Sequence, residues 1–274
     1  MTFAPLEHAL DENRFGGKAA QLAKALRAGL PVPRGAAVSV TLVDAVARGD
    51  PAAAREVERP ASSLRTPLAV RSSAVDEDSD VASFAGQHLT CLNVCSAAEA
   101  VAAVSEIHRS AREGAALAYR ARVGINGPPR VAVVIQELVD ADCAGVLFTR
   151  NPLDGADEFV VEAAWGLGET VVAGLVTPDR FRIGRGGEVV ERGAGLKDVA
   201  VVRAPNGGTR QLTIEEERAR ALCLTDRQLA ELARLGEHCE RVFGGARDLE
   251  WAYAGGTLHL LQCRAITRTS ALRS

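Results

Sequence analysis

The chain has 274 residues, of which 47% are hydrophobic, and its formal net charge at pH 7 is −3. A chain of this length can bury a substantial core, in one large domain or in two lobes. The weakly acidic balance gives no attraction to nucleic acid or to an anionic membrane, and no apolar run approaches the roughly 20 residues of a membrane span. We therefore expect a globular cytoplasmic protein with neither of those partners.

The cysteines and the N-terminal segment agree with that expectation. The chain contains six cysteines, scattered along its length, and four lie within or beside apolar runs. This distribution is typical of reduced thiols in the core of a cytosolic protein. Residues 1–18 lack the basic-then-apolar layout of a signal peptide. Cys91 and Cys95 have no matching second pair, so we expect no metal site there.

The first half of the chain alternates helical and extended patterns. Apolar residues recur at helical spacing after Gly16-Gly17-Lys18, and Gly29 ends that pattern. The predicted elements are a helix over residues 16–29, an apolar stretch over 36–43, helical structure up to residue 61, a strand over 66–73 and a helix over 97–122.

The second half is richer in strands. Apolar runs bounded by turn residues predict strands over residues 131–140, 143–152, 158–166, 180–184 and 188–193, and a hairpin over 248–264. Between them, Thr213 precedes a long helical pattern over 214–243 with glutamates in its first turn, which predicts an N-cap at Thr213. This order of elements predicts an α+β fold with mixed or antiparallel sheets.

Arg71 stands where the strand over 66–73 enters a loop of small and acidic residues. Its planar guanidinium can bind a pair of phosphate oxygens, and serine hydroxyls and loop N–H groups can complete an anion site. Gly86, further along, lets the backbone come close to a ligand. From the residues by themselves, a structural ion pair of Arg71 beside an acidic surface loop explains the pattern equally well.

Two other segments can contribute to a nucleotide site. The glycines before Lys18 expose N–H groups at a helix start, and the lysine can reach a phosphate, although the spacing is not that of a P-loop. The strand over 131–140 emerges at Gln136, Glu137 and Val139, where backbone donors and acceptors suit the edge of adenine. The simpler readings are a solvated lysine and an ordinary core strand.

The terminal hairpin carries four polar side chains. Asp248 and Glu250 share a strand face, and so do Gln262 and Arg264, because strand side chains repeat every two residues. Cross-strand pairing can bring the four together. Oxygens of Glu250 and Gln262 suit Mg²⁺, and a guanidinium suits a phosphate. The alternative is an exposed hairpin face with a cross-strand ion pair.

Taken together, these segments resemble the ATP-binding domain shared by phosphoenolpyruvate synthase, pyruvate phosphate dikinase and rifampicin phosphotransferase. The matching words are GGK at 16–18, AVRSSA at 69–74, SFAGQ at 83–87, WGLGE at 165–169, VAG at 172–174, TPD at 177–179, and DLEW at 248–251 with LQCR at 261–264. One departure is Ala265, where the family usually has proline.

The resemblance implies a two-lobed, ATP-grasp-like nucleotide-binding fold, with lobes over residues 1–139 and 140–274. It implies ATP contacts at Lys18, Arg71, Gly86, Gln87, Gln136, Glu137, Val139, Glu169, Asp248 and Arg264. Lys18, Arg71 and Arg264 would neutralise the triphosphate, and Glu250 and Gln262 would bind Mg²⁺. Glu169 can equally face the metal or end a turn.

In that family the β-phosphoryl of ATP passes to a histidine on a separate swivelling domain, and AMP is released. None of the five histidines here stands in the family's T-x-H-G-G word. The resemblance therefore implies a histidine carrier and an acceptor-binding domain in trans. A direct small-molecule kinase and a non-catalytic ATP-binding regulatory subunit are the alternatives, and the sequence does not name the final acceptor.

Overall fold

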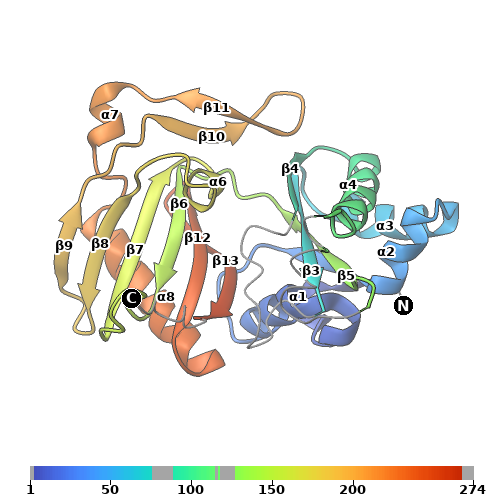
Figure 1. Cartoon of the computed structure of the whole chain (residues 1–274), viewed down its shortest axis with the longest axis horizontal. Coiled ribbons are helices and arrows are strands. Elements are labelled where there is room, and N and C mark those ends of the chain that lie inside the picture. The colour runs from blue at the N-terminus through green and yellow to red at the C-terminus, as the bar shows by residue number, and fades with distance from the viewer. Residues whose placement is uncertain (1–2, 76–88, 115–116, 118–126, 267–274) are drawn as a thin grey trace. The chain divides into compact units, whose positions relative to one another are not determined.

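The structure is a computed structural model that describes residues 3–75, 89–114, 117 and 127–266. The chain divides into two compact units. Unit 1 comprises Met1–Arg27, Pro33–Leu138 and Arg203–Thr209, and unit 2 comprises Ala28–Val32, Val139–Val202 and Arg210–Ser274. Each unit has its own sheet and its own helices (Figure 1).

Unit 1 is built on a five-stranded antiparallel sheet. In spatial order its strands are β1 (Phe3–Pro5), β2 (Gly35–Val38), β5 (Val131–Glu137), β3 (Leu68–Ala74) and β4 (Thr90–Val94). Its helices are η1 (Leu6–His8), α1 (Glu12–Arg27), α2 (Val40–Ala47), α3 (Pro51–Ser63) and α4 (Ala97–Ser110). Side-chain oxygens of Ser39, Asp50 and Ser96 accept backbone N–H groups at the starts of α2, α3 and α4, which fixes where these helices begin.

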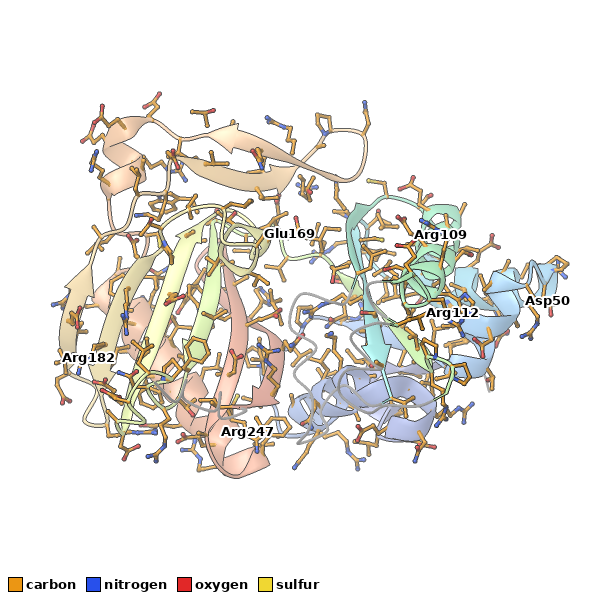
Figure 2. The ribbon with its side chains drawn as sticks, viewed as in Figure 1. Asp50, Arg109, Arg112, Glu169, Arg182 and Arg247 are labelled. Carbon is orange, nitrogen blue, oxygen red and sulfur yellow. The ribbon has the colours of Figure 1, made fainter. Side chains whose placement is uncertain are left out.

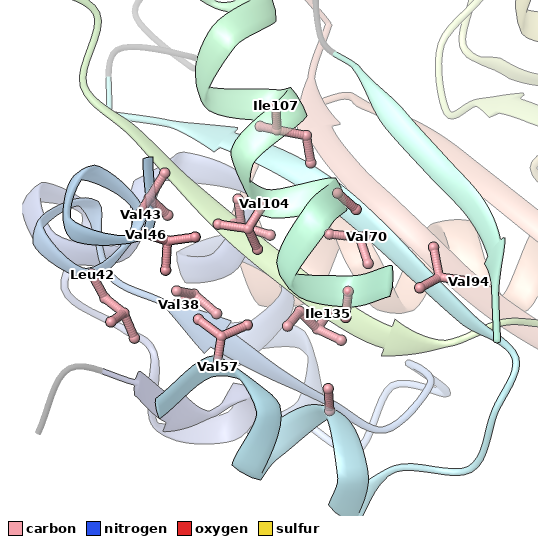
Figure 3. Packing of buried hydrophobic residues seen from close by; sticks show 14 of the residues in the cluster. Val38, Leu42, Val43, Val46, Val57, Val70, Val94, Val104, Ile107 and Ile135 are labelled. Atoms are coloured by element: carbon pink, nitrogen blue, oxygen red, sulfur yellow. The ribbon is translucent and has the colours of Figure 1, made fainter. Parts of the chain in front are cut away.

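The main core of unit 1 lies between one face of this sheet and helices α2, α3 and α4 (Figure 3). Val70 and Ile135 are fully buried there, and Val57 and Val104 pack on them from α3 and α4. Because strand side chains alternate, residues of the other parity face the opposite side, where α1 packs on β3 and β5. The sheet is therefore covered on both faces.

A hairpin tip belongs to unit 1 although its strands continue from unit 2. The strands are β10 (Val199–Arg203) and β11 (Thr209–Thr213). Asn93, at the end of β4, donates hydrogen bonds from its side-chain amide to the carbonyl oxygens of Ala204 (2.7 Å) and Gly208 (2.8 Å). These bonds fix the tip, because Asn93 is buried and its amide has no water to bind instead.

Unit 2 is built on a six-stranded antiparallel sheet. In spatial order its strands are β13 (Thr257–Ala265), β12 (Arg247–Ala254), β6 (Cys143–Phe148), β7 (Glu158–Trp165), β8 (Asp179–Gly184) and β9 (Val189–Gly193). Its helices are α6 (Glu169–Val172), α7 (Glu216–Arg220) and α8 (Asp226–Phe243). Leu249, Trp251 and Tyr253 of β12 are buried on one face, and the Tyr253 hydroxyl donates to the Gln228 carbonyl oxygen of α8 (3.1 Å). Helix α8 therefore covers that face.

The structure confirms the predicted α+β class and the antiparallel pairing of both large sheets. The prediction of one helix over 214–243 is wrong, because Thr213 ends β11 and the segment forms α7 and α8 separately. Thr225 starts α8 through a reciprocal capping box with Gln228, which explains the break. The helix predicted over 97–122 ends at Ser110 within the described ranges.

Two other predictions concern membranes and thiols. Within the described ranges, none of the helices combines the length and apolar character that crossing a bilayer requires. All six cysteines are free, and four of them are buried. Burial raises the pKa of Cys91 to about 11, so this thiol stays protonated and unreactive near neutral pH.

Candidate functional site

In unit 1, the start of α1 packs directly against the end of β3. Gly16 has a φ of 78°, and a Cβ atom placed there would lie 2.1 Å from the Ser73 carbonyl oxygen. Only glycine allows this approach, because other residues disfavour a positive φ and their Cβ would clash. The Ala19 N–H donates to the Ser73 hydroxyl oxygen (3.0 Å). The GGK and RSS words, which are far apart in the sequence, therefore meet.

This packing buries two cations beside the same short stretch of strand. Lys18 is 7% exposed, and its ammonium group donates to the Ser72 carbonyl oxygen (3.1 Å). Arg71 is 9% exposed and lies on the sheet face that α1 covers. Keeping a charged group out of water is costly unless polar groups surround it. Two buried cations on one face create a positive potential that attracts an anionic ligand.

The two serines that follow Arg71 do not share its surroundings. Ser73 lies on the same face as Arg71, whereas Ser72 lies on the face of Val70, toward the core. The Ser72 hydroxyl is buried and has no hydrogen-bond partner in the described part of the chain. Ser73 is thus the serine of this pair that belongs to the anion-binding side of β3.

The strand β5 ends at the residues predicted to contact adenine. The Gln136 amide donates to the Pro33 carbonyl oxygen (3.2 Å), and the Glu137 N–H donates to the Arg34 carbonyl oxygen (2.9 Å). The Glu137 carboxylate accepts the Arg65 N–H (3.2 Å) and pairs with the Arg65 guanidinium (3.4 Å). Both side chains therefore hold neighbouring loops of unit 1. An adenine contact here stays a prediction, as does any role of Val139.

Two predicted site residues, Gly86 and Gln87, lie outside the described residues. The remaining predicted residues belong to unit 2.

In unit 2, the face of the sheet opposite α8 carries the polar side chains of the terminal hairpin. Asp248 pairs with Arg264 across the two strands, and Glu250 pairs with Gln262. A bulge between Glu250 and Trp251 shifts the register just beyond this point. The strand register therefore places these four side chains on one face of the sheet, as the sequence predicted.

Asp248 and Arg264 form an ion pair on this face. The Arg264 Nε donates to Asp248 Oδ2 (2.8 Å), and Nη2 lies 2.7 Å from the same oxygen. Burial raises the pKa of Asp248, and the charge and hydrogen bond of Arg264 oppose that rise. Glu250 and Gln262 are partly exposed beside the pair. Their oxygens fit the ligand preference of Mg²⁺, which takes the rest of its shell from water and phosphate.

Two charged residues that sequence reasoning missed lie on the same face. Glu250 is paired with Val146, Val146 with Glu162, and Glu162 with Arg180. Paired residues of an antiparallel sheet project to the same side, so these residues form one row across four strands. The available signal was the alternation in β7 and β8, where Glu162 and Arg180 stand next to buried apolar residues of the other parity.

The WGLGE and TPD words form the scaffold beside this face. Glu169 begins α6, and Figure 2 shows it far from Arg182, which lies on β8. Gly166 has a φ of 79°, and a Cβ there would lie 2.4 Å from the Val201 carbonyl oxygen. The Thr170 hydroxyl oxygen accepts the Val201 N–H (3.0 Å). These contacts hold Val201 of β10 against the segment that contains Gly166 and Thr170.

Asp179 of the TPD word takes part in a fully buried ion pair with Lys197, which the sequence did not predict. The Asp179 carboxylate also accepts the N–H groups of Gly195 (2.9 Å) and Cys223 (2.8 Å). Because Lys197 is completely shielded from solvent, this pair stabilises the fold and does not contact a ligand.

Unit 1 thus holds two buried cations, and unit 2 holds a set of acid, amide and arginine side chains on one sheet face. The family described as pyruvate phosphate dikinase, AMP/ATP-binding domain, matches residues 51–274. The chain belongs to this family, which confirms the resemblance found in the sequence.

Two relatives show the same relationship. Rifampicin phosphotransferase of Streptomyces sviceus is 42% identical over 208 residues, which cover 75% of this chain and 24% of that protein. A probable phosphoenolpyruvate synthase of Methanocaldococcus jannaschii is 39% identical over 203 residues, which cover 73% of this chain and 17% of that protein. The chain thus spans about a quarter or less of the length of these relatives.

Among solved structures, D-alanyl-alanine synthetase A of Vibrio cholerae O1 matches 96% of this chain and 58% of its own, with a TM-score of 0.41 at 9% identity.

Proposed function

We propose that this chain is the ATP-binding part of a dikinase-type phosphotransferase that passes the β-phosphoryl of ATP to a histidine on another domain or protein. The observation that carries the proposal is the packing of α1 on β3, which buries Lys18 of α1 and Arg71 of β3. Membership in an AMP/ATP-binding family makes the triphosphate the anion that these cations would neutralise. In the overall reaction, ATP, the histidine and one water molecule give AMP, phosphohistidine and inorganic phosphate: the histidine takes the β-phosphoryl as the bond to AMP breaks, and water takes the γ-phosphoryl as the bond between the β- and γ-phosphates breaks.

The residues of this chain would act by positioning and neutralising charge, which is most of what phosphoryl transfer requires from a protein. Lys18 and Arg71 would bind phosphate oxygens in unit 1, and Arg264 would do so in unit 2, held in place by Asp248. Glu250 and Gln262 would bind Mg²⁺, which would neutralise charge on the phosphates. Gln136, Glu137 and Val139 would contact adenine, and Glu169 would contact ATP or face the metal.

The acceptor histidine and the final acceptor would come from a separate domain or protein, and we place the reaction in the cytoplasm, in keeping with the free thiols. The test uses ATP labelled at the β- or the γ-position, incubated with this chain with and without a T-x-H-G-G carrier. We expect acid-labile β-label on the carrier and AMP in solution. Efficient phosphorylation of a small molecule by this chain without a carrier, with ADP as product, would support the direct-kinase alternative instead.

Nucleotide binding can be measured independently of turnover. MgATP at a hundredfold excess over its dissociation constant should stabilise the fold by about 2.7 kcal/mol. Titration calorimetry with no heat at millimolar MgATP would contradict the proposal.

A further inference from the structure

Arg180 and Arg182 lie on the same strand and the same sheet face, yet their surroundings differ. Arg182 donates to the carboxylates of Glu158 (2.9 Å) and Glu191 (3.2 Å). For the side chain of Arg180, the described part of the chain provides neither a hydrogen bond nor an ion pair within 4.0 Å, and its Nε is shielded from solvent. Arg180 is thus a half-buried guanidinium whose Nε–H group has no hydrogen-bond partner in the described part of the chain.

The residue opposite Arg180 does not neutralise it. Glu162 is its direct partner in the register of β7 and β8, but no ion pair joins the two side chains in the described structure. Arg180 has only a weak electrostatic effect on another nearby carboxylate, Glu158. Among the groups that lower the pKa of Glu158, the charge of Arg180 contributes least. Leaving the shielded Nε–H group of this guanidinium without a partner is costly. An anion bound beside Arg180 would remove that cost.

The row that contains Arg180 also contains the predicted metal ligands. Gln262, Glu250, Val146, Glu162 and Arg180 follow one another across five strands. Three strand spacings separate Glu250 from Arg180, or about 14 Å between their Cα atoms. An arginine and a glutamate that lean toward each other over Val146 leave room for a cation and one phosphate group between their ends.

We propose that Arg180 is a further phosphate-binding residue, which holds the phosphate chain of the nucleotide from the side opposite Glu250 and Gln262. The proposal rests on the proposed function, because it assumes that the anion is the nucleotide's phosphate. Guanidinium groups suit this task, since their donors match pairs of phosphate oxygens and stay charged at every physiological pH. Val146 and Glu162 lie between the two in this row, and the carboxylate of Glu162 beside Arg180 can accept a hydrogen bond or contribute to metal binding.

The test compares Arg180→Gln with Arg182→Gln in titration calorimetry with MgATP, MgADP, AMP and adenosine. Arg180→Gln should weaken MgATP binding about tenfold or more, because a hydrogen bond to a charged group is lost. It should leave adenosine binding unchanged, because adenosine has no phosphate. Arg182→Gln, on the same strand and face, should leave both affinities near those of the unmodified chain. Arg180→Lys should recover part of the loss.

The outcomes separate this proposal from the proposed function. If the unmodified chain binds MgATP and Arg180→Gln binds it equally well, Arg180 is a structural residue and this inference is wrong. Equal losses of MgATP and adenosine affinity in Arg180→Gln would also overturn it, because they indicate a disturbed fold. If the unmodified chain itself does not bind MgATP, the proposed function fails first. Melting temperatures of all variants show whether each one is folded.

Discussion

Units 1 and 2 hold their charged groups in opposite ways. In unit 1, Lys18 and Arg71 are buried where a helix start packs on a strand, and Lys18 is bound to a main-chain carbonyl oxygen. In unit 2, the charged groups stand in rows on the face of a sheet that α8 leaves uncovered, and Asp248 is bound to a side chain of the next strand. Backbone packing therefore positions the first set, and strand register positions the second.

This difference predicts how each set responds to mutation. A change in the packing of α1 on β3 should disturb the unit 1 cations together with the fold. A change of a partly exposed side chain on the sheet face opposite α8, such as Glu250, should alter binding while the scaffold stays intact. Both tryptophans, Trp165 and Trp251, belong to unit 2, so their fluorescence reports on that unit.

The largest effect should come from the scaffold of unit 2. Lys197→Met removes one partner of the buried pair with Asp179 and leaves a buried carboxylate without its counter-charge. We expect a loss of about 3–5 kcal/mol in the free energy of unfolding. Urea unfolding followed by tryptophan fluorescence measures it.

The matched control is Arg220→Met, which breaks an exposed pair with Glu216 and should cost about 0–1 kcal/mol. A loss below about 1 kcal/mol for Lys197→Met would show that water or other polar groups compensate for the buried charge.

The next effect concerns the face of the unit 2 sheet opposite α8. Glu250→Ala removes one proposed oxygen ligand of Mg²⁺ without touching the core. Turnover with the carrier should fall by about a hundredfold or more, since metal charge stabilises the transferring phosphoryl group. Nucleotide affinity should weaken less and lose its dependence on Mg²⁺ concentration. Near-normal AMP formation by Glu250→Ala would show that the hairpin has only a structural role.

A smaller effect tests the packing of unit 1. Gly16→Ala and Gly29→Ala both place a side chain at a positive φ, 78° and 77° respectively. Only the Gly16 variant meets a neighbour, since nothing lies within 4 Å of a Cβ at Gly29. We expect Gly16→Ala to cost about 1–3 kcal/mol more than its control, and also to weaken MgATP binding. Far-UV circular dichroism in urea measures the first, and calorimetry the second.

Equal stability of the Gly16 and Gly29 variants would mean that α1 moves freely on β3. The idea that backbone packing positions Lys18 would then have no support.

The smallest effect is a pH dependence that both units share. Burial lowers the pKa of His108 in unit 1, and the charge of Arg112 lowers it further, against the opposing effect of Asp44. Burial also lowers the pKa of His259 in unit 2. Unfolding raises both values toward about 6.5, so the unfolded chain binds more protons in acid. Stability is complete above about pH 6.5 and falls as the pH drops from there toward the lowered folded-state values.

Each histidine can contribute a slope of at most about 1.4 kcal/mol per pH unit. His108→Gln should flatten the pH response of circular dichroism, and His259→Gln that of tryptophan fluorescence. A response that neither variant changes would assign the pH dependence to other groups.

The alternation along each strand followed from local sequence rules, because Asp248 and Glu250 share a face of β12 as Gln262 and Arg264 share a face of β13. Which residues pair across the hairpin did not follow from those rules. The turn pairs Ala254 with Thr257, and continuing that register would put Leu261 opposite Glu250; the bulge between Trp251 and Glu250 shifts the register by one residue and puts Gln262 there instead. The break before α8 could also have been found, since Thr225 and Gln228 have the spacing of a capping box.

Other features had no local signal. Lys197 resembles any lysine in a polar segment, and only the folded chain shows that it meets Asp179 out of water. Local sequence also does not distinguish Arg180 from Arg182, because they are two residues apart and alternation places both on the same face of β8. Glu191 of β9 and Glu158 of β7 accept hydrogen bonds from Arg182, whereas no described residue accepts one from Arg180.

The sequence by itself determined the family, the α+β class and the residue types of the candidate site, because motifs, periodicity and turn residues act over short stretches of chain. The tertiary structure decided which of those residues share a face: it joined Gly16 to Ser73, turned Ser72 toward the core and placed Glu162 and Arg180 in the row of Glu250. The physical reason is that these relations depend on strand register and helix packing between segments far apart in the chain. Their free energy comes from burying whole faces, and no single segment encodes it.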